Sequence, residues 1–470
     1  MNKMRALVTV VAALALTGCN MAPKYNRPKA PVPDTWPQGE AYESSAAKGS
    51  GASVQLHPED VLPDQKLLQI LQLALEQSRD LRLAVLNVEQ ARNLYRIQRA
   101  ELFPSVSASA SGTAQRSSRH LSRPGEQRNT DRYNVDLGIS AWEIDLFGRI
   151  RNLKDSALEQ FFAFEEYQRG AEILLVSEVA RVYYTLAADQ EALKLARSTL
   201  AAQEDSNNLI NALYRNGLAT ELDLRRAQTQ VEAAREDVWL YTQLVAQDTN
   251  ALNLLVGAPV PPDWLPGSLD DVVPPEAVQP GLSSEVLLSR PDVAASEHQL
   301  KAVHADIGAA RAALFPRIGL TAVGGTASNA LSGLFDAGTA TWTFAAQAVA
   351  PIFDARTWAA LRLTENQKEI LLTQYEKAIQ TAFRETADTL AALGTIDERI
   401  QAHESLLEAS SEAYRLSQVR YQNGLDSYLG VLDAQRSLYS AQQGMVWLKL
   451  AKFSDQIRLY AVLGGQGYRP

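Results

Sequence analysis

The side chains that most often perform catalysis or bind metals are scarce in this chain. Its 470 residues include one cysteine and five histidines, and neither a glycine-rich phosphate loop nor a nucleophile-elbow serine accompanies them. We therefore expect no zinc site, no disulfide framework, no enzymatic centre and no soluble cofactor. The histidines are scattered along the sequence, at His57, His120, His298, His304 and His403.

The single cysteine follows a segment that is typical of exported proteins. Residues 1–18 begin with two cations, continue with an apolar run and end in Thr17-Gly18. The apolar run spans roughly 11 residues, whereas a transmembrane helix needs about 20. Leu16-Thr17-Gly18-Cys19 resembles the lipobox of bacterial lipoproteins, which implies cleavage before Cys19 and a covalent S-diacylglycerol and N-palmitoyl lipid on that residue. The alternative is an ordinary signal peptide followed by a chance cysteine.

The residue after the cysteine and the overall charge bear on location and partners. Asn20 stands where lipoproteins retained in the inner membrane commonly carry an Asp, so we expect the outer membrane. The formal net charge is −9, and the sequence does not suggest a lysine- and arginine-rich face. A nucleic-acid partner is therefore not expected, because phosphate binding needs a cationic surface.

An internal duplication organises the chain. Residues 99–104 recur as 311–316, and residues 214–218 recur as 421–425, in the same order and with nearly constant separation. Such matches predict two structural repeats. The predicted order is a signal peptide at 1–18, an extended arm at 19–63, a first repeat at 64–263, a linker at 264–279, a second repeat at 280–464 and a tail at 465–470. The Pro-, Gly- and Ser-rich arm could instead be a disordered tether.

Each repeat is expected to contain long helical rods in the order helix, two strands, helix, turn, helix. Four stretches contain neither Gly nor Pro, at residues 64–103, 171–216, 218–256 and 355–393. The first, as one helix of about 40 residues, would be roughly 60 Å long. Such helices are three to four times the usual length and predict coiled-coil-like packing.

Between the rods the hydrophobic period changes from helical to two. Alternating segments predict strands at about 105–113, 133–142, 317–325 and 342–350. Each is close to the length of a tilted strand that crosses an outer membrane, although an ordinary half-buried sheet is the alternative. Four strands cannot close a barrel, so two chains would give eight strands and three would give twelve. A trimer is expected if the barrel conducts.

Several ordered motifs carry a family resemblance. They resemble those of the outer-membrane factors of multidrug efflux systems, most closely the lipid-anchored OprM type within the TolC superfamily. The resemblance extends from Cys19 to about Gly465. Besides the lipobox, the motifs are residues 142–149, 289–292, 309–316, 331–336 and 432–438.

The resemblance implies a mixed α/β membrane protein. It implies a homotrimer in which a shared twelve-stranded outer-membrane β-barrel continues into a long periplasmic α-helical barrel. Such a protein is a passive exit channel, which works with a periplasmic membrane-fusion adaptor and an inner-membrane resistance-nodulation-division pump. Relatives often carry a Trp and a Phe pair just after the arm, where this chain has Pro58, Val61 and Leu62.

Two Asn-Gly turns are expected to join the long helices. Glycine adopts the positive φ that ends a helix, so these residues are predicted helix C-caps. The expected helix lengths put both turns far from the membrane, at the periplasmic end. The turn residues are Asn216 and Gly217 in the first repeat, and Asn423 and Gly424 in the second.

The resemblance also implies a gate beside the second turn. Rings of Leu429 and Asp433 would form an apolar constriction next to a negative one, which is a usual way to close a pore. Arg420 and Tyr421 match residues that hold Asp433 in place. The alternative for Asp433 is a solvated helix charge. The equivalent register of the first repeat adds Leu222 and Arg226.

Two other functions remain as alternatives. The same architecture serves channels for type I protein export, and a lipid-anchored coiled-coil spacer would need no pore. The lipobox and the OprM-type motifs favour drug efflux over protein export, and the predicted membrane strands argue against a spacer.

Overall fold

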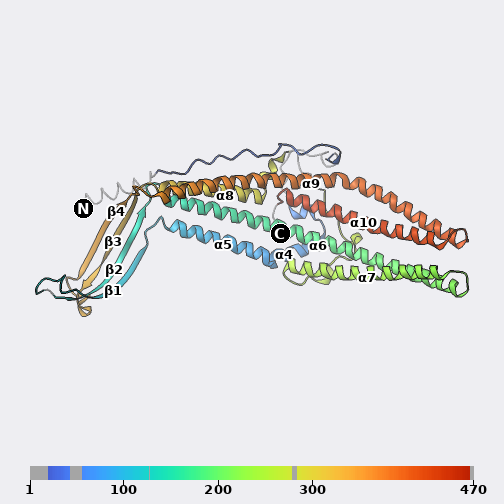
Figure 1. The fold of residues 1–470 in the computed structure, drawn as a ribbon, viewed down its shortest axis with the longest axis horizontal. Helices are drawn as coiled ribbons and strands as arrows, with labels where there is room; N and C mark the ends of the chain where they lie inside the picture. The colour runs from blue at the N-terminus through green and yellow to red at the C-terminus, as the bar shows by residue number, and fades with distance from the viewer. Residues whose placement is uncertain (1–18, 43–55, 126, 278–282, 466–470) are drawn as a thin grey trace. The chain divides into compact units, whose positions relative to one another are not determined.

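The computed structural model describes residues 19–42, 56–125, 127–277 and 283–465 (Figure 1). The predicted signal peptide and nearly all of the predicted tail lie outside these ranges. The chain forms two compact units. The first contains the described parts of residues 1–29, 88–164 and 296–375, and the second contains those of 30–87, 165–295 and 376–470. Both sequence repeats contribute to both units, so a repeat is not a spatial domain.

The first unit contains a four-stranded antiparallel sheet in the order β1-β2-β3-β4 (Figure 1). Its strands are β1 (Val106–Arg116), β2 (Asn129–Ile144), β3 (Arg317–Ser328) and β4 (Ala340–Val349). The strand β2 has 16 residues and extends beyond the predicted segment at both ends, and its pairing with β3 is irregular between Ile139 and Trp142. At this bulge Ala141 has a φ of 55°.

The strand register separates an apolar face of the sheet from a polar one. Residues that are directly paired point to the same side. One such row contains Ala108, Leu137, Gly324 and Trp342, while the opposite face carries rows such as Ser109, Asp136, Gly325 and Thr341. On the apolar face the exposed fractions are 61% for Leu137 and 81% for Trp342. This apolar surface is therefore uncovered in the single chain.

The prediction of one continuous helix over residues 64–103 is wrong, because two helices occupy this stretch. These are α4 (Gln65–Gln77) and α5 (Arg79–Ala100). Ser78 between them has ψ 129°, which is extended, and it is buried. Gly257, in the left-handed region with φ 80°, packs so closely that a Cβ on it would lie 2.4 Å from the Gln77 carbonyl oxygen. The contact between Gly257 and Gln77 lies where the helix is interrupted, and no Gly or Pro in the local sequence marks the break.

Two of the other rods, α6 and α9, are longer than the Gly- and Pro-free stretches that predicted them, whereas α7 is slightly shorter. Gly170 lies inside α6 and Gly394 inside α9, and neither ends its helix. At Gly394 a Cβ would lie 2.0 Å from the Ala41 carbonyl oxygen, so the glycine allows the arm to approach the helix. Nowhere in the described ranges is a helix both long and apolar enough to cross a membrane. The long helices are α6 (Arg149–Arg215), α7 (Glu221–Val256), α8 (Pro291–Ala312), α9 (Ala355–Gln422) and α10 (Tyr428–Val462), and the short ones are η1 (Glu40–Tyr42), α3 (Pro58–Val61), η2 (Pro262–Trp264), η3 (Leu269–Asp271), η4 (Ser284–Ser289) and η5 (Leu331–Gly333).

The main core lies in the second unit, where α4, α6, α7 and α10 meet. Tyr183 and Tyr184 are fully buried there, and the Tyr183 hydroxyl donates to Asp64 Oδ1 at 3.2 Å. Asp64 also caps α4, because it accepts from the Lys66 and Leu67 amides at 3.0 Å each. Pro58, Val61 and Leu62 are all buried, and Val61 and Leu62 belong to this core.

The described part of the N-terminal arm makes specific contacts within each unit. In the first unit Arg27 donates to both carboxylate oxygens of Glu297, at 3.0 and 2.7 Å, and Tyr25 donates to the same carboxylate at 3.1 Å. In the second unit Trp36 stacks on Phe383 with ring centroids 5.4 Å apart. Residues 43–55 of the predicted arm lie outside the described ranges.

Candidate functional site at the helix turns

The two Asn-Gly turns have nearly the same geometry. Gly217 has φ 72° and Gly424 has φ 69°, both in the left-handed region. The Leu218 amide donates to the Leu213 carbonyl at 2.8 Å, and the equivalent bond in the second turn, from Leu425 to Arg420, is 2.9 Å. These six-to-one hydrogen bonds are the helix-ending pattern expected of glycine C-caps.

The asparagine side chains of the turns give a second hydrogen bond to helix carbonyls that also accept the asparagine backbone amides. Asn216 Nδ2 donates to the Ala212 carbonyl and Asn423 Nδ2 donates to the Val419 carbonyl, each at 2.7 Å. The four backbone carbonyls at a helix end have no partner within the helix. The Asn-Gly pair therefore has a structural task in both turns.

The two helical hairpins are packed together by a small apolar cluster. At its edge the rings of Tyr421 and Tyr428 lie 5.3 Å apart. Burial and the nearby Asp223 carboxylate both raise the pKa of Tyr421, so the second turn faces the start of α7. The cluster holds the four helix ends in one arrangement, and its buried members are Ile210, Leu224, Ala227, Tyr428, Val431 and Leu432.

The charged residues of the predicted gate have other partners within the chain. Arg420 donates to both oxygens of Asp426, at 2.5 and 3.2 Å, and this bond lowers the pKa of Asp426. Asp433 forms an ion pair with Arg436, one turn further along α10. Within one chain, Arg420 and Asp433 therefore do not pair with each other. A contact between Arg420 of one chain and Asp433 of another stays a prediction.

The apolar residues of the predicted gate are accessible. Leu429 is 41% exposed and Leu222 is 58% exposed. Each is the second residue of its helix, α10 and α7, and neither is a buried member of the cluster between the hairpins. Arg226 is half-buried and forms no ion pair with any described carboxylate. Leu429 and Leu222 are therefore available to a surface outside the chain.

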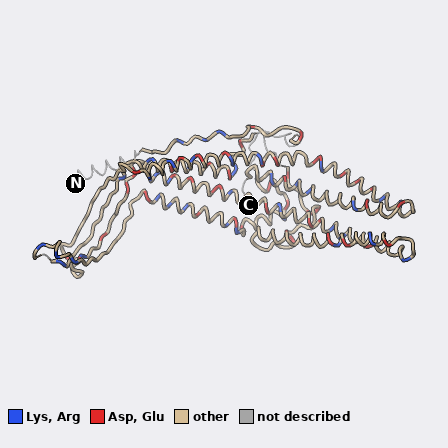
Figure 2. The backbone as a smooth tube through the Cα atoms, viewed as in Figure 1, with Lys and Arg blue, Asp and Glu red and all other residues tan. Residues whose placement is uncertain are grey.

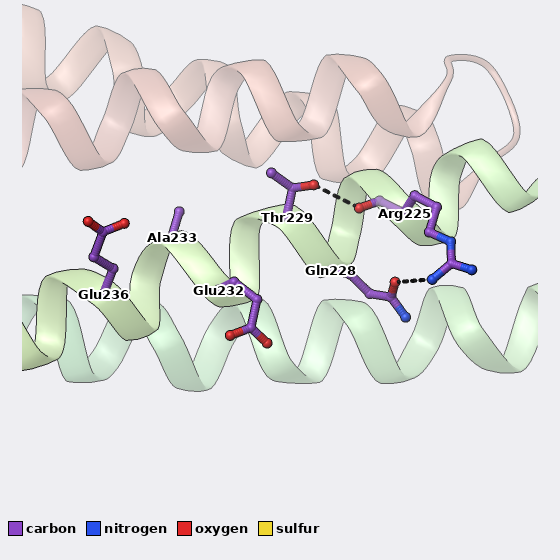
Figure 3. A pocket seen from close by; sticks show the side chains of 6 residues that line it. All are labelled: Arg225, Gln228, Thr229, Glu232, Ala233 and Glu236. Carbon is purple, nitrogen blue, oxygen red and sulfur yellow. Dashed lines mark hydrogen bonds between the residues drawn. The ribbon is translucent and has the colours of Figure 1, made fainter.

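Figure 3 shows a shallow recess along α7, next to the first turn. Arg225 donates to Gln228 Oε1 at 3.1 Å, and it also forms an ion pair with Glu221 at 3.3 Å. All of the lining side chains come from one face of one helix, so the recess is a polar surface groove and not an enclosed pocket. The lining residues are Arg225, Gln228, Thr229, Glu232, Ala233 and Glu236.

Sequence reasoning missed a pair of carboxylic acids between α6 and α7, the buried Asp189 and the half-buried Asp248. Asp189 is only 4% exposed. Burial and the hydrogen-bonded carboxyl of Asp248 raise the pKa of Asp189 to about 7, and burial raises that of Asp248. Nearby, Gln443 of α10 donates to the Tyr241 hydroxyl at 3.0 Å. In the sequence these residues are only two acids within predicted helices, and acidic residues are common on helix surfaces.

Cys19, the predicted lipidation site, is exposed and lies against the connection between β2 and α6. Gly148 in that connection has φ 80°, and a Cβ on it would be 3.0 Å from the Cys19 carbonyl oxygen. The sulfur has no disulfide partner in the described chain. The described part of the chain also contains no cluster of His, Cys, Asp and Glu that could hold a metal ion.

Comparisons with known proteins agree with this architecture. The family profile described as "Outer membrane efflux protein" matches residues 70–258 and 282–465, one segment in each repeat. Two proteins of Pseudomonas putida are 44% identical over 463 residues, covering 98% of this chain and 96% of theirs: the antibiotic efflux pump outer membrane protein ArpC and the toluene efflux pump outer membrane protein TtgC.

A solved channel has the same fold. The open state of the MtrE outer membrane channel of Neisseria gonorrhoeae has a TM-score of 0.85 and 36% identity, covering 96% of this chain and 99% of that one. The chain therefore belongs to the outer membrane efflux protein family. The predicted family, fold class, efflux function and outer-membrane location are confirmed, and the two profile segments agree with the two predicted repeats.

Proposed function

We propose that three copies of this chain form the passive exit channel of a tripartite efflux pump. The observation that carries the proposal is the open four-stranded sheet with an exposed apolar face. Its edge strands β1 and β4 have unpaired backbone groups, and each such group costs several kcal/mol in lipid. Twelve strands from three copies would remove the edges and leave room for a pore, whereas eight would enclose only side chains.

The expected partners are a periplasmic adaptor and an inner-membrane resistance-nodulation-division pump. ArpC is named for antibiotics and TtgC for toluene, which supports small drugs and apolar solvents as the cargo. Energy and selectivity would come from the pump, and this chain would perform no enzymatic chemistry and need no cofactor. The exposed apolar sheet face argues against a non-conducting spacer, and the names of these relatives favour small compounds over exported proteins.

The gate of this channel would be formed by Leu429 and Asp433 around the trimer axis. The exposure of Leu429 and of the Asp433 side chain, at 57%, supports this arrangement. Arg420 and Tyr421 of a neighbouring copy would then compete with Arg436 for the carboxylate. Leu222 and Arg226 would hold the equivalent positions on the first hairpin.

Lipid on Cys19 would anchor each protomer beside the sheet. The exposed position of Cys19 against the β2–α6 connection supports this role, because that connection marks the end of the sheet where the helices begin. The lipid would be the only covalent addition, and the polypeptide would still provide the apolar surface of the barrel.

The decisive experiment combines mass and conductance. The purified lipoprotein should sediment in mild detergent with the mass of a trimer, and planar bilayers containing it should show discrete conductance steps. A monomer in a detergent that preserves the helices would contradict the proposed assembly. A stable trimer that never conducts, even after the gate substitutions considered in the Discussion, would favour the spacer.

A further inference from the structure

The connections between helices and strands contain a stacked pair of phenylalanines. Phe147 lies between β2 and α6, Phe315 lies between α8 and β3, and their ring centroids are 4.8 Å apart at an interplanar angle of 22°. The strand β2 runs towards the helices, its neighbour β3 runs away from them, and the two strands pair antiparallel. The stack thus joins the end of one strand to the start of the next at the helix end of the sheet.

The internal duplication predicts a second pair of this kind. Phe103 corresponds to Phe315, because residues 99–104 recur as 311–316. Phe353 corresponds to Phe147, because each follows a strand and stands two residues before the first residue of a long helix. Phe103 is 64% exposed and Phe353 is 92% exposed. Both members of the second pair are therefore present in the chain and accessible.

The two exposed phenylalanines cannot stack on each other within one chain. Phe103 precedes β1 and Phe353 follows β4, and these strands are the opposite edges of the sheet (Figure 1). Three strand spacings separate the edges, which is about 14 Å. Stacked rings have centroids only about 4.5–7 Å apart. The partner that the duplication predicts for each ring must therefore come from another chain.

Both edge strands lack the features that usually protect an exposed edge. Such edges carry charges, prolines or bulges, which prevent pairing with other chains. The strand β4 has no charged residue and no proline, and β1 has one charged residue, Arg116, at its last position. Figure 2 shows these two strands as almost free of charge. The irregular pairing of the sheet involves β2, an interior strand. Both edges are therefore suited to pair with a further strand.

The strand pairings identify which residues correspond in the two repeats. Gly112 of β1 corresponds to Gly324 of β3, with the same separation as the recurring motif that precedes each strand. Gly112 pairs with Tyr133 and Gly324 pairs with Trp342, so an aromatic residue faces a glycine in both repeats. The strand β4 also runs towards the helices as β2 does, and β1 runs away from them as β3 does.

This correspondence predicts how β4 of one copy pairs with β1 of the next. In the chain, Leu137 of β2 faces Gly324 of β3. Leu137 corresponds to Ala346, because each stands four residues after the aromatic residue of its strand. Ala346 of one copy is therefore expected to face Gly112 of the next. Counted from that pair towards the helices, the phenylalanine after β4 is seven residues away and the one before β1 is nine, so the two rings reach nearly the same level.

We propose that Phe353 of each copy stacks on Phe103 of the next copy and so fixes the pairing of β4 with β1 at the helix end of the sheet. The inference rests on the trimer proposed above, and it specifies which side chains and which register join the copies. Each copy has Phe353 at one edge and Phe103 at the other, so the contact is head-to-tail and forms a closed ring when the rotation between copies closes. Three copies would have three identical aromatic pairs.

The test is thiol crosslinking of the full-length protein in isolated outer membranes with a short bismaleimide. F103C and F353C, made on separately tagged copies and expressed together, should give a covalent dimer that contains both tags. Either variant expressed alone should remain a monomer on a denaturing gel, and the parent is the control for reaction of Cys19. The matched control replaces F353C by F335C, because Phe335 is also exposed, at 76%, but lies in the loop at the other end of the strands. That combination should give no dimer with both tags.

A double-mutant cycle gives a second measurement that needs no thiol. F103A and F353A should each shorten the half-life of the trimer in denaturing detergent by about tenfold, because three aromatic contacts are lost per trimer and lost contacts act mainly on dissociation. The double variant should lose little more than either single variant, since all of them remove the same contact. F335A is the control and should stay within about twofold of the parent.

Two results would overturn the proposal. The first is a trimer in which F103C and F353C give no more dimer than the F335C control, and the second is an additive loss of half-life in the alanine cycle. If the cysteine variants do not assemble, the cycle decides, and F103L and F353L replace the alanine variants if those do not assemble. A trimer without the crosslink contradicts this inference alone, whereas a monomeric parent contradicts the assembly proposed above.

Discussion

At the scale of single residues, the ion pairs near the second turn decide how the gate is tested. Arg420 and Asp433 each have a partner in their own chain, Asp426 and Arg436. Exposed pairs of this kind contribute about 0.2–1 kcal/mol each. A contact between Arg420 and Asp433 of different chains would therefore compete with ion pairs of similar strength inside each chain. Small changes in free energy would shift the equilibrium between the two arrangements.

The substitution Asp433→Ala should open the channel. Three copies lose one inter-chain contact each, so open probability in planar bilayers should rise by about threefold to one hundredfold while the trimer stays intact. Arg420→Ala should have a similar effect, and the double substitution should give less than the sum, because both remove one interaction.

The control for the gate is Arg436→Ala. It removes only the partner of Asp433 inside the chain, so it should leave the channel closed or close it further. If Asp433→Ala and Arg420→Ala both conduct like the parent, the carboxylate is a solvated helix charge and the gate lies elsewhere.

The buried acids predict an unusual dependence of stability on pH. The pKa of Asp189 is raised to about 7, so between roughly pH 4 and 7 the folded protein holds a proton that the unfolded chain has released. Stability should therefore fall as pH rises from about 4 to 7 and then level off, since the Asp189 carboxyl must ionise next to Asp248. The surrounding groups offset this loss of stability only in part. Arg181 lowers the pKa of Asp248, and Tyr241 is neutral.

Asp189→Asn should remove this pH dependence. The thermal midpoint of the variant should exceed that of the parent at pH 8 and approach it at pH 5. The free energies of unfolding should differ by a few kcal/mol at most, because one pKa unit corresponds to about 1.4 kcal/mol. Asp205→Asn on an exposed position of α6 is the control and should follow the parent. A variant that is less stable than the parent at every pH would show that the pair acts through its hydrogen bond and not through its charge.

At the scale of elements, the break between α4 and α5 depends on Gly257. Gly257→Ala puts a methyl group 2.4 Å from the Gln77 carbonyl oxygen and also keeps an L-residue at positive φ. Thermal unfolding of the trimer should show a loss of about 2–4 kcal/mol. Gly217→Ala is the matched control, because its φ is similar but nothing lies within 4 Å of its Cβ position. It should cost only about 1–2 kcal/mol, and equal losses in both variants would mean that the close contact with Gln77 has no effect.

At the scale of the whole molecule, the lipid and the barrel should have separable tasks. Cys19→Ser behind a cleavable non-lipid signal should abolish incorporation of labelled palmitate and still give an outer-membrane trimer in cell fractionation, because the apolar sheet face supplies the membrane surface. The matched control Thr17→Ser in the native signal should still incorporate labelled palmitate. Loss of both trimer and outer-membrane location in Cys19→Ser would show that the lipid is needed for assembly.

The local features of this protein could be predicted from its amino-acid sequence. The strands, the Asn-Gly turns and most of the long helices follow from patterns in consecutive residues, because periodicity and positive φ are properties of a short stretch of backbone. The recurrence of these patterns also predicted the two repeats, and the motifs predicted the family.

Contacts between distant segments could not be predicted from the sequence and became visible in the folded chain. The helix break at Ser78 accompanies close packing of Gly257, and the glycines inside α6 and α9 did not end their helices. Asp426 and Arg436, rather than each other, became the partners of Arg420 and Asp433. The burial of Asp189 beside Asp248 also appeared only then, because burial and pairing depend on residues that are far apart in the sequence and meet only when the chain folds.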